Sequence, residues 1–338
     1  MPDNTVRSTR RPVWARCLAL LQVAVIAYVV AACGLLDGET ASTSSSGAEH
    51  GVIRVGILAT VDNAPVKLAE KRGFFHKYGV DVEVTVFRSG PEALTEVAAG
   101  KLDICLINYV SFFQAVSKKT MDGRVIADAY QATPDSVVLM TRPNAGILTP
   151  ADLPGKKISV HAPGNINELL LRALLQNNGL DPGSPSYLPI AFPNIQAALN
   201  AGEIAAGVMV EPYITQAEQQ IGAVPALKVA VDATADMPMS GYVALTAFTR
   251  DHPEKVTAFQ RGIRDANDLA NNDRASLAEV LPDLAKVPAD NVALLNLGKF
   301  PTSVEAARLQ RVLDLMSTYG GLPPGLNAKD LTIPIPEG

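Results

Sequence analysis

The order of predicted strands and helices repeats after about a hundred residues, and this repeat constrains the fold more than any other feature of the sequence. In the first copy, strands at 53–58, 80–87 and 102–107 alternate with helices at 65–72 and 91–99; in the second, strands at 157–161, 186–190 and 204–210 alternate with helices at 165–177 and 195–201. The glycines that end the second helix of each copy, Gly100 and Gly202, also correspond. Such alternation is typical of α/β proteins with mostly parallel sheets. We therefore predict two similar βαβαβ lobes rather than one long sheet.

The C-terminal third of the chain has a helical pattern, with predicted helices beginning near Asp251 and Thr302. We expect these helices to complete the first lobe, which is then discontinuous in sequence. The predicted lobes are residues 51–140 plus 242–338 for lobe 1, and residues 141–241 for lobe 2. Two crossing segments, near 138–145 and 236–246, would join them, and a connection of this kind permits hinge closure over a ligand.

The N-terminus has the pattern of an export signal. Four arginines precede an apolar run from Cys17 to Ala32, whose sixteen residues would span roughly 24 Å as a helix, less than the about 30 Å hydrocarbon core of a bilayer. The run ends in Val30-Ala31-Ala32-Cys33, which resembles a bacterial lipobox. We predict a signal peptide at 1–32 and lipidation of Cys33, with a signal anchor as the alternative. Export by the general or by the twin-arginine route stays open, because Arg10-Arg11 is followed by Pro12.

Residues 33–50 are rich in Gly, Ser, Thr and Ala, a composition that forms a flexible tether. A lipid and a tether would hold the protein on the outer face of the bacterial cell membrane. Without residues 1–32, the chain has 306 residues, with 25 basic and 33 acidic side chains. This acidic balance argues against nucleic acid as a partner. Cys105 would be the one remaining unmodified cysteine, and it would have no second cysteine for an intramolecular disulfide. We therefore expect Cys105 to be a small buried hydrophobic residue.

Several stretches of the body resemble one family of solute-binding proteins. They are Leu68-Ala69-Glu70-Lys71-Arg72-Gly73-Phe74-Phe75, 77–83, 98–103, 152–158, Glu211-Pro212-Tyr213 and the stretch from His252-Pro253-Glu254. The family binds aliphatic sulfonates, nitrate, taurine or thiamine-pyrimidine precursors. The resemblance implies a type II periplasmic-binding-protein fold of class α/β, with ligand held between the lobes. It also implies delivery of the solute to an ABC permease with its cytoplasmic ATPase, and we expect a monomer without a cofactor or metal.

The candidate ligand-binding residues follow the predicted strands, because ligands of open α/β sheets gather beyond the carboxyl ends of the strands. Helix N-termini also begin there and favour anionic or carbonyl oxygens. The candidates are Thr60, Asp62, Asn63, Ser89, Asn108, Tyr109, Gln131, Gly164, Asn165, Glu211, Tyr213, Ser240 and Tyr242. In the hypothesis for the pocket, Tyr109 and Tyr213 face each other from opposite lobes and cover a flat solute.

Each candidate also has a purely structural interpretation. Ser89 and Asn165 are suited to capping their helices, and Gly164 to a tight turn. The tyrosines are equally suited to the core, and Glu211 to bracing the hinge. The set is mainly neutral, and Asp62 would repel an anion. Because no arginine clamp is evident, we favour a small polar or heteroaromatic organic solute, with or without one acidic group, over nitrate.

Two other functions share this fold. One branch of the resembled fold synthesises the thiamine pyrimidine with an iron site and a histidine after the third strand. Here that stretch reads Asn108-Tyr109-Val110-Ser111, the branch's cysteine-rich signature is missing, and the four histidines lack metal-ligand spacing. We therefore predict a binding protein and not an enzyme. A ligand sensor that signals through a partner remains the other alternative.

Overall fold

The computed structural model describes residues 51–336. The predicted signal peptide 1–32, the Cys33 lipidation site and the tether 33–50 therefore lie outside the described residues. Among the helices of 51–336, none is long and apolar enough to cross a membrane.

Lobe 1 is built on a five-stranded sheet in the order β2-β1-β3-β10-β4. The strands are β1 (Gly51–Leu58), β2 (Val80–Phe87), β3 (Ile104–Asn108), β4 (Gly123–Gln131) and β10 (Pro238–Leu245). Strand β1 runs parallel to β2 and β3, whereas β10 runs antiparallel to β3 and β4. The last strand in sequence thus lies inside the sheet and returns the chain from lobe 2 to lobe 1.

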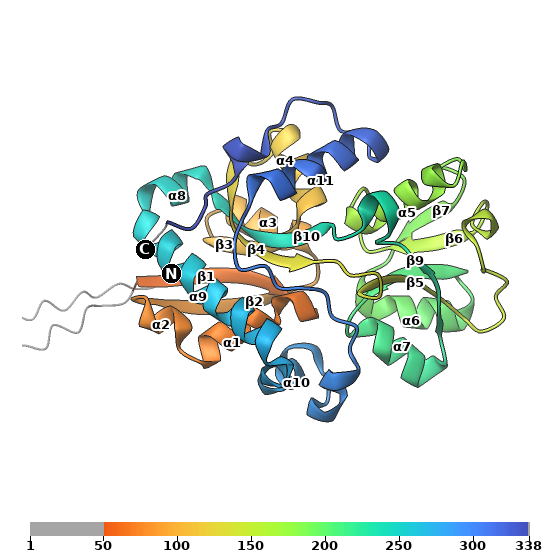
Figure 1. Ribbon diagram of the computed structural model, residues 1–338, viewed down its shortest axis with the longest axis horizontal. Helices are drawn as coiled ribbons and strands as arrows, with labels where there is room; N and C mark the ends of the chain where they lie inside the picture. Colours follow the sequence, from red (N-terminus) through yellow and green to blue (C-terminus); the bar gives the residue numbers. More distant parts are fainter. Residues whose placement is uncertain (1–50, 337–338) are drawn as a thin grey trace, which may run out of the picture. The chain divides into compact units, whose positions relative to one another are not determined.

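Helices cover both faces of this sheet (Figure 1). On one face lie α1 (Ala64–Lys71), α2 (Phe74–Lys77) and α9 (Pro253–Asn272), and on the other α3 (Gly90–Ala98), α4 (Tyr109–Ser117) and α11 (Ala306–Tyr319). Two further short helices are α8 (Thr246–Asp251) and α10 (Leu281–Ala285). Helix α9 buries one apolar face against α1 and α2, where the rings of Phe75 and Phe259 stack with centroids 5.3 Å apart. The C-terminal helices therefore complete lobe 1.

Lobe 2 repeats the pattern with a sheet in the order β7-β6-β8-β5-β9. Its strands are β5 (Val137–Thr141), β6 (Lys157–Val160), β7 (Ser186–Pro189), β8 (Ala206–Val210) and β9 (Val224–Lys228), and its helices are α5 (Ile166–Asn177), α6 (Phe192–Ala201) and α7 (Tyr213–Ile221). Helix α5 covers one face of the sheet, and α6 and α7 lie together on the other (Figure 1). The predicted α/β fold with two βαβαβ lobes is confirmed.

The sheets are mixed rather than mostly parallel, and the crossings lie earlier than the sequence suggested. Strand β5 pairs antiparallel with β8 and β9, so 137–141 belongs to lobe 2. The chain crosses between the sheets at 132–136 and 229–237, compared with the expected 138–145 and 236–246. All five residues of β5 are buried, as a central strand requires, but an apolar run does not reveal which of two sheets it joins.

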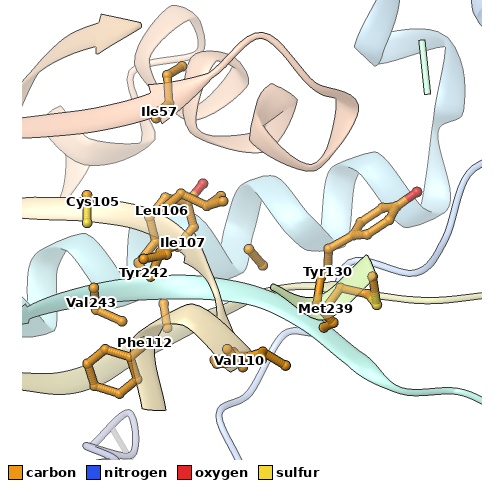
Figure 2. Packing of buried hydrophobic residues seen from close by; sticks show 14 of the residues in the cluster. Ile57, Cys105, Leu106, Ile107, Val110, Phe112, Tyr130, Met239, Tyr242 and Val243 are labelled. Atoms are coloured by element: carbon orange, nitrogen blue, oxygen red, sulfur yellow. The ribbon is translucent and has the colours of Figure 1, made fainter. Parts of the chain in front are cut away.

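The core of lobe 1 lies where β3 meets β10. Figure 2 shows Cys105 and Leu106 of β3 beside Tyr242 and Val243 of β10, with Phe112 of α4 next to them. Cys105 is fully buried, and burial raises the pKa of its thiol. The predicted role of this cysteine as a small hydrophobe therefore agrees with its surroundings.

Close packing at Gly241 of β10 gives a stability prediction. A Cβ at this position would lie 2.3 Å from the Tyr109 hydroxyl and 2.8 Å from the Ala127 carbonyl oxygen. We expect Gly241→Ala to lower the free energy of unfolding by about 1–3 kcal/mol through overpacking, measured by urea denaturation. Gly183→Ala is the matched control, because its Cβ would approach no atom closer than 3.4 Å. Equal losses in the two variants would contradict this account.

Candidate ligand-binding cleft

A cavity opens between the carboxyl ends of the strands of both lobes. Its empty space is about 630 Å³, including the part that is open to solvent. Six of the predicted residues line it: Thr60, Asp62, Asn108, Asn165, Glu211 and Ser240. We call this space the inner cavity. Residues from five separate turns and strands thus meet in one place, as the position of the strand ends predicted.

On the lobe 1 side, hydrogen bonds hold the Asp62 carboxylate in a fixed position. Its Oδ1 accepts from the Thr60 hydroxyl at 2.5 Å and from Asn63 Nδ2 at 2.9 Å, while Oδ2 accepts from the Ser240 hydroxyl at 2.8 Å. Withdrawal from water raises the pKa of Asp62, and the bonds from Thr60, Ser240 and Asn63 oppose this rise. Asn63 is itself fully buried and does not line the inner cavity. Its amide instead ties the turn after β1 to Leu58, whose N–H donates to Asn63 Oδ1.

On the lobe 2 side, three rings form a continuous stack. His161 lies on Phe192 with centroids 4.3 Å apart and planes 10° apart, and Phe192 lies on Tyr213 with centroids 5.6 Å apart. Neither ring nitrogen of His161 has a hydrogen-bond partner among the described residues, and burial lowers the pKa of His161 to about 4. The wall therefore offers an aromatic face together with the ring nitrogens of a neutral imidazole.

Asn167 provides another free polar group. Its side chain is 2% exposed, lines the inner cavity, and its Nδ2 has no hydrogen-bond partner among the described residues. A buried donor without a partner costs about 1–3 kcal/mol, so a ligand that accepts from it gains the corresponding energy. Asn167 and His161 are thus polar side chains of the cavity wall with nitrogen atoms that have no hydrogen-bond partner among the described residues.

The helix N-termini at the inner cavity are occupied by side-chain caps. Ser89 Oγ accepts from the N–H of Glu92, Asn108 Oδ1 from that of Ser111, and Asn165 Oδ1 from that of Glu168. The capping interpretation of Ser89 and Asn165 is thus confirmed. Because a cap and a ligand compete for the same donors, α3, α4 and α5 have less to offer an anion than uncapped helices would.

Glu211 both lines the inner cavity and joins the lobes. Its carboxylate accepts from the hydroxyl and the N–H of Thr215 at 2.9 Å and 3.1 Å, and from the Asn296 N–H of lobe 1 at 2.8 Å. Nearby, the Tyr213 hydroxyl donates to the Ala59 carbonyl at 3.2 Å. Glu211 therefore braces the two lobes, as one of its two interpretations proposed. Because Glu211 also lines the cavity, this role does not prevent contact with a solute.

Four other predicted residues lie away from the inner cavity. Tyr109 is fully buried, donates to Asp128 Oδ1 at 2.9 Å and stacks on Phe113, while Tyr242 packs edge-on against Phe259 inside lobe 1. The hypothesis of a tyrosine from each lobe facing the other across the solute is therefore wrong. Gln131 bonds Arg308 and Asp236, and the Gly164 carbonyl accepts from Gln114 at 2.7 Å.

Several cavity residues were not predicted: Tyr130, Phe192 and Met239, together with His161, for which a structural role was favoured. Phe192 follows strand β7, so the strand-end rule could have identified it. Tyr130 lies in β4 and Met239 in β10, next to the predicted residues Gln131 and Ser240. Side chains alternate along a strand, and the sequence did not show which neighbours on these strands face the cavity. Figure 2 shows both at the end of the lobe 1 core, beyond Tyr242.

The charged side chains that line the inner cavity are of one sign. Among the described residues that line it, Asp62 and Glu211 are acidic and none is lysine or arginine. Within 51–336, no cluster of histidine, cysteine, aspartate and glutamate could hold a metal ion. The site is therefore suited to binding through aromatic contact and hydrogen bonds.

Comparison with protein families gives a match over residues 46–282 to the NMT1-like family. The chain belongs to this family. A putative binding protein of Brucella abortus is 24% identical over 82% of this chain and 89% of its own, and a putative aliphatic sulfonates-binding protein of Escherichia coli is 28% identical over 68% and 72%. These relatives are binding proteins and not enzymes, in agreement with the prediction for this chain.

Among solved structures, the periplasmic aliphatic sulphonate binding protein of Escherichia coli has a TM-score of 0.68 at 19% identity, covering 83% of this chain and 97% of its own. The periplasmic-binding-protein fold inferred from the sequence motifs is therefore confirmed.

The buried imidazole leads to a prediction about pH. The pKa of His161 is lowered from 6.5 to about 4, so between these values the unfolded chain binds the proton that the folded protein excludes. Stability is fully present above pH 6.5 and is lost as pH falls toward 4. The variant His161→Phe keeps the stack on Phe192 but has no imidazole to titrate. Between pH 7 and pH 5, we expect its free energy of unfolding to fall by about 1–2 kcal/mol less than that of the unsubstituted protein. Parallel pH profiles of unfolding free energy would refute the assignment.

Proposed function

We propose that this protein is the extracytoplasmic solute-binding component of an ABC importer, which captures a small organic solute between its lobes and delivers it to a membrane permease. The names of its relatives support this role: besides the two binding proteins above, a relative in Brachyspira hyodysenteriae is named a putative ABC transporter periplasmic binding protein. A two-lobed fold with a cavity between the lobes suits capture and release.

The solute that best fits the inner cavity is a flat heteroaromatic ring with N–H donors, neutral or weakly basic. The observation that carries this proposal is that the His161 and Phe192 rings and the Asp62 carboxylate line one cavity, in which no described lining residue is a lysine or arginine. A flat ring would contact these two rings, and aromatic pairs gain about 0.5–1.5 kcal/mol beyond area burial. Ring amines would donate to Asp62, whose carboxylate has acceptor capacity beyond its three present bonds. Ring nitrogens would accept from Asn167.

An alkanesulfonate or nitrate fits the inner cavity less well. Such an anion would approach two carboxylates, and like charges at close range disfavour the charged form. Arginine or lysine would compensate, but neither lines the inner cavity among the described residues. The side chains of Asn108 and Asn165 also occupy helix donors that would otherwise receive the anion.

A thermal-shift panel tests the solute class. We expect 4-amino-2-methylpyrimidine to stabilise the purified protein, by about 2.7 kcal/mol at a concentration of 100 times its dissociation constant. Ethanesulfonate, taurine and nitrate at equal concentrations should give smaller shifts. Stabilisation by ethanesulfonate but not by the aminopyrimidine would overturn the proposed solute class.

A pair of phenylalanine variants locates the binding. Phe192→Leu should weaken aminopyrimidine binding about two- to tenfold by removing an aromatic ring from the cavity wall, as measured by calorimetry. Phe248→Leu is the matched control, because Phe248 also contacts a histidine, His252, with centroids 5.1 Å apart, but does not line the inner cavity. Equal affinities in both variants would place the site elsewhere.

We also propose that the mature protein is held on the membrane by a lipid on Cys33, because the sequence Val30-Ala31-Ala32-Cys33 resembles a lipobox. Cys33→Ala should remove the protein from the membrane fraction or leave it unprocessed, because the thiol that accepts the lipid is absent. Fractionation with metabolic palmitate labelling measures this, with Cys17→Ala as a control that keeps the lipobox. Normal labelling of Cys33→Ala would contradict the anchor.

A further inference from the structure

A second space adjoins the inner cavity on the side of β2 and α6. This outer vestibule has about 890 Å³ of empty space, including the part open to solvent. It shares four lining residues with the inner cavity: Leu58, Thr60, His161 and Phe192. The two spaces are therefore neighbouring compartments, and the His161–Phe192 pair forms part of the wall of both.

The vestibule differs from the inner cavity in charge. Among the described residues that line either compartment, Arg88 is the one lysine or arginine, and it lines the vestibule, where no aspartate or glutamate does. The Arg88 N–H donates to Glu92 Oε2 at 3.2 Å, but the Arg88 guanidinium has no hydrogen bond or ion pair within 51–336. An arginine without a partner beside a large opening is available to an anionic group of a ligand.

The remaining wall suits an apolar stem. Val86 of β2 lines the vestibule and is 53% exposed. Phe87, Pro193 and Tyr213 line the same space. Helix α6 also begins here, and its N-cap residue, Ala191, has no side chain that could accept from the first turn. The positive end of α6 thus adds to the potential set by Arg88, in contrast to the capped helices of the inner cavity.

We propose that the outer vestibule is a second subsite, which binds an anionic arm of the solute at Arg88. This proposal rests on the proposed function, because it places the heteroaromatic ring in the inner cavity. The complete solute is then a flat ring joined by a short apolar stem to a carboxylate or a similar anion. Opposite charges in the two compartments fix its orientation: Asp62 and Glu211 repel the anion, and Arg88 attracts it.

A matched pair of probes tests the arm on the full protein. One is 4-amino-2-methylpyrimidine with a butanoate arm on carbon 5, and the other is the corresponding butanamide. We expect the carboxylate to bind about fivefold more tightly than the amide, the upper range for one exposed ion pair, and this preference to shrink at high salt. Arg88→Gln should abolish the preference, so that the carboxylate and the amide bind the variant with equal affinity.

Lys118→Gln is the control, because it removes one positive charge from an exposed position of lobe 1 that lines neither compartment. A carboxylate preference that survives in Arg88→Gln, or that is lost equally in Lys118→Gln, would overturn the subsite. So would equal binding of carboxylate and amide by the unsubstituted protein.

A fragment without the heteroaromatic ring separates this proposal from the proposed function. Phenylacetate carries only an apolar group and the anion, and it should bind more tightly than phenylacetamide in a manner that requires Arg88. If the aminopyrimidine ring fails to bind but phenylacetate shows this dependence, the proposed solute ring is wrong and the anionic subsite stands. If the ring binds and phenylacetate shows no preference over phenylacetamide, the subsite is wrong and the proposed function stands.

Discussion

A carboxylate withdrawn from water must receive hydrogen bonds, and in this protein that requirement fixes the lobe 1 side of the site. The three donors to Asp62 come from two distant parts of the chain, with Thr60 and Asn63 in the turn after β1 and Ser240 in β10. The carboxylate thus fastens the first strand of the lobe to the strand that returns from lobe 2. Burial of a charged group without such bonds would cost several kcal/mol, so the turn and the returning strand keep their positions together.

The two compartments also differ in how the N-termini of their helices are hydrogen-bonded. In the inner cavity, Asn108 and Asn165 use their side chains to cap helices, which leaves neutral surfaces and the free groups of His161 and Asn167. At α6, Ala191 supplies no cap. Pro193 has no N–H and the Asn194 N–H donates to the Ala191 carbonyl at 2.9 Å, so α6 contributes to the potential of the adjoining space mainly through its macrodipole.

The sequence predicted the repeated lobes well because strand and helix periodicities are local. It predicted Asp62, Asn165 and Glu211 as residues of the cavity because turns after strands gather at one edge of a sheet. It failed where the outcome depended on side-chain direction. Tyr109 follows β3 as expected, but it opens α4 with its ring turned into the core, where Asp128 accepts from its hydroxyl. The sequence also did not show to which lobe β5 belongs, because the residues of one strand do not determine which distant strand it pairs with.

The contacts between the lobes are both polar and apolar. Glu211 accepts from the Asn296 N–H, Tyr213 donates to Ala59, and Gln114 donates to Gly164. Helix α5 also packs against α4 and α11, where a Cβ at Gly320 would lie 3.0 Å from Leu169 Cδ1. A hydrogen bond contributes about 0.5–1.5 kcal/mol net, somewhat more where a charge takes part, and the buried apolar contacts add to this energy. A solute that contacts both lobes at once would add its own binding energy to the same arrangement, and it would therefore favour the form in which the lobes lie together.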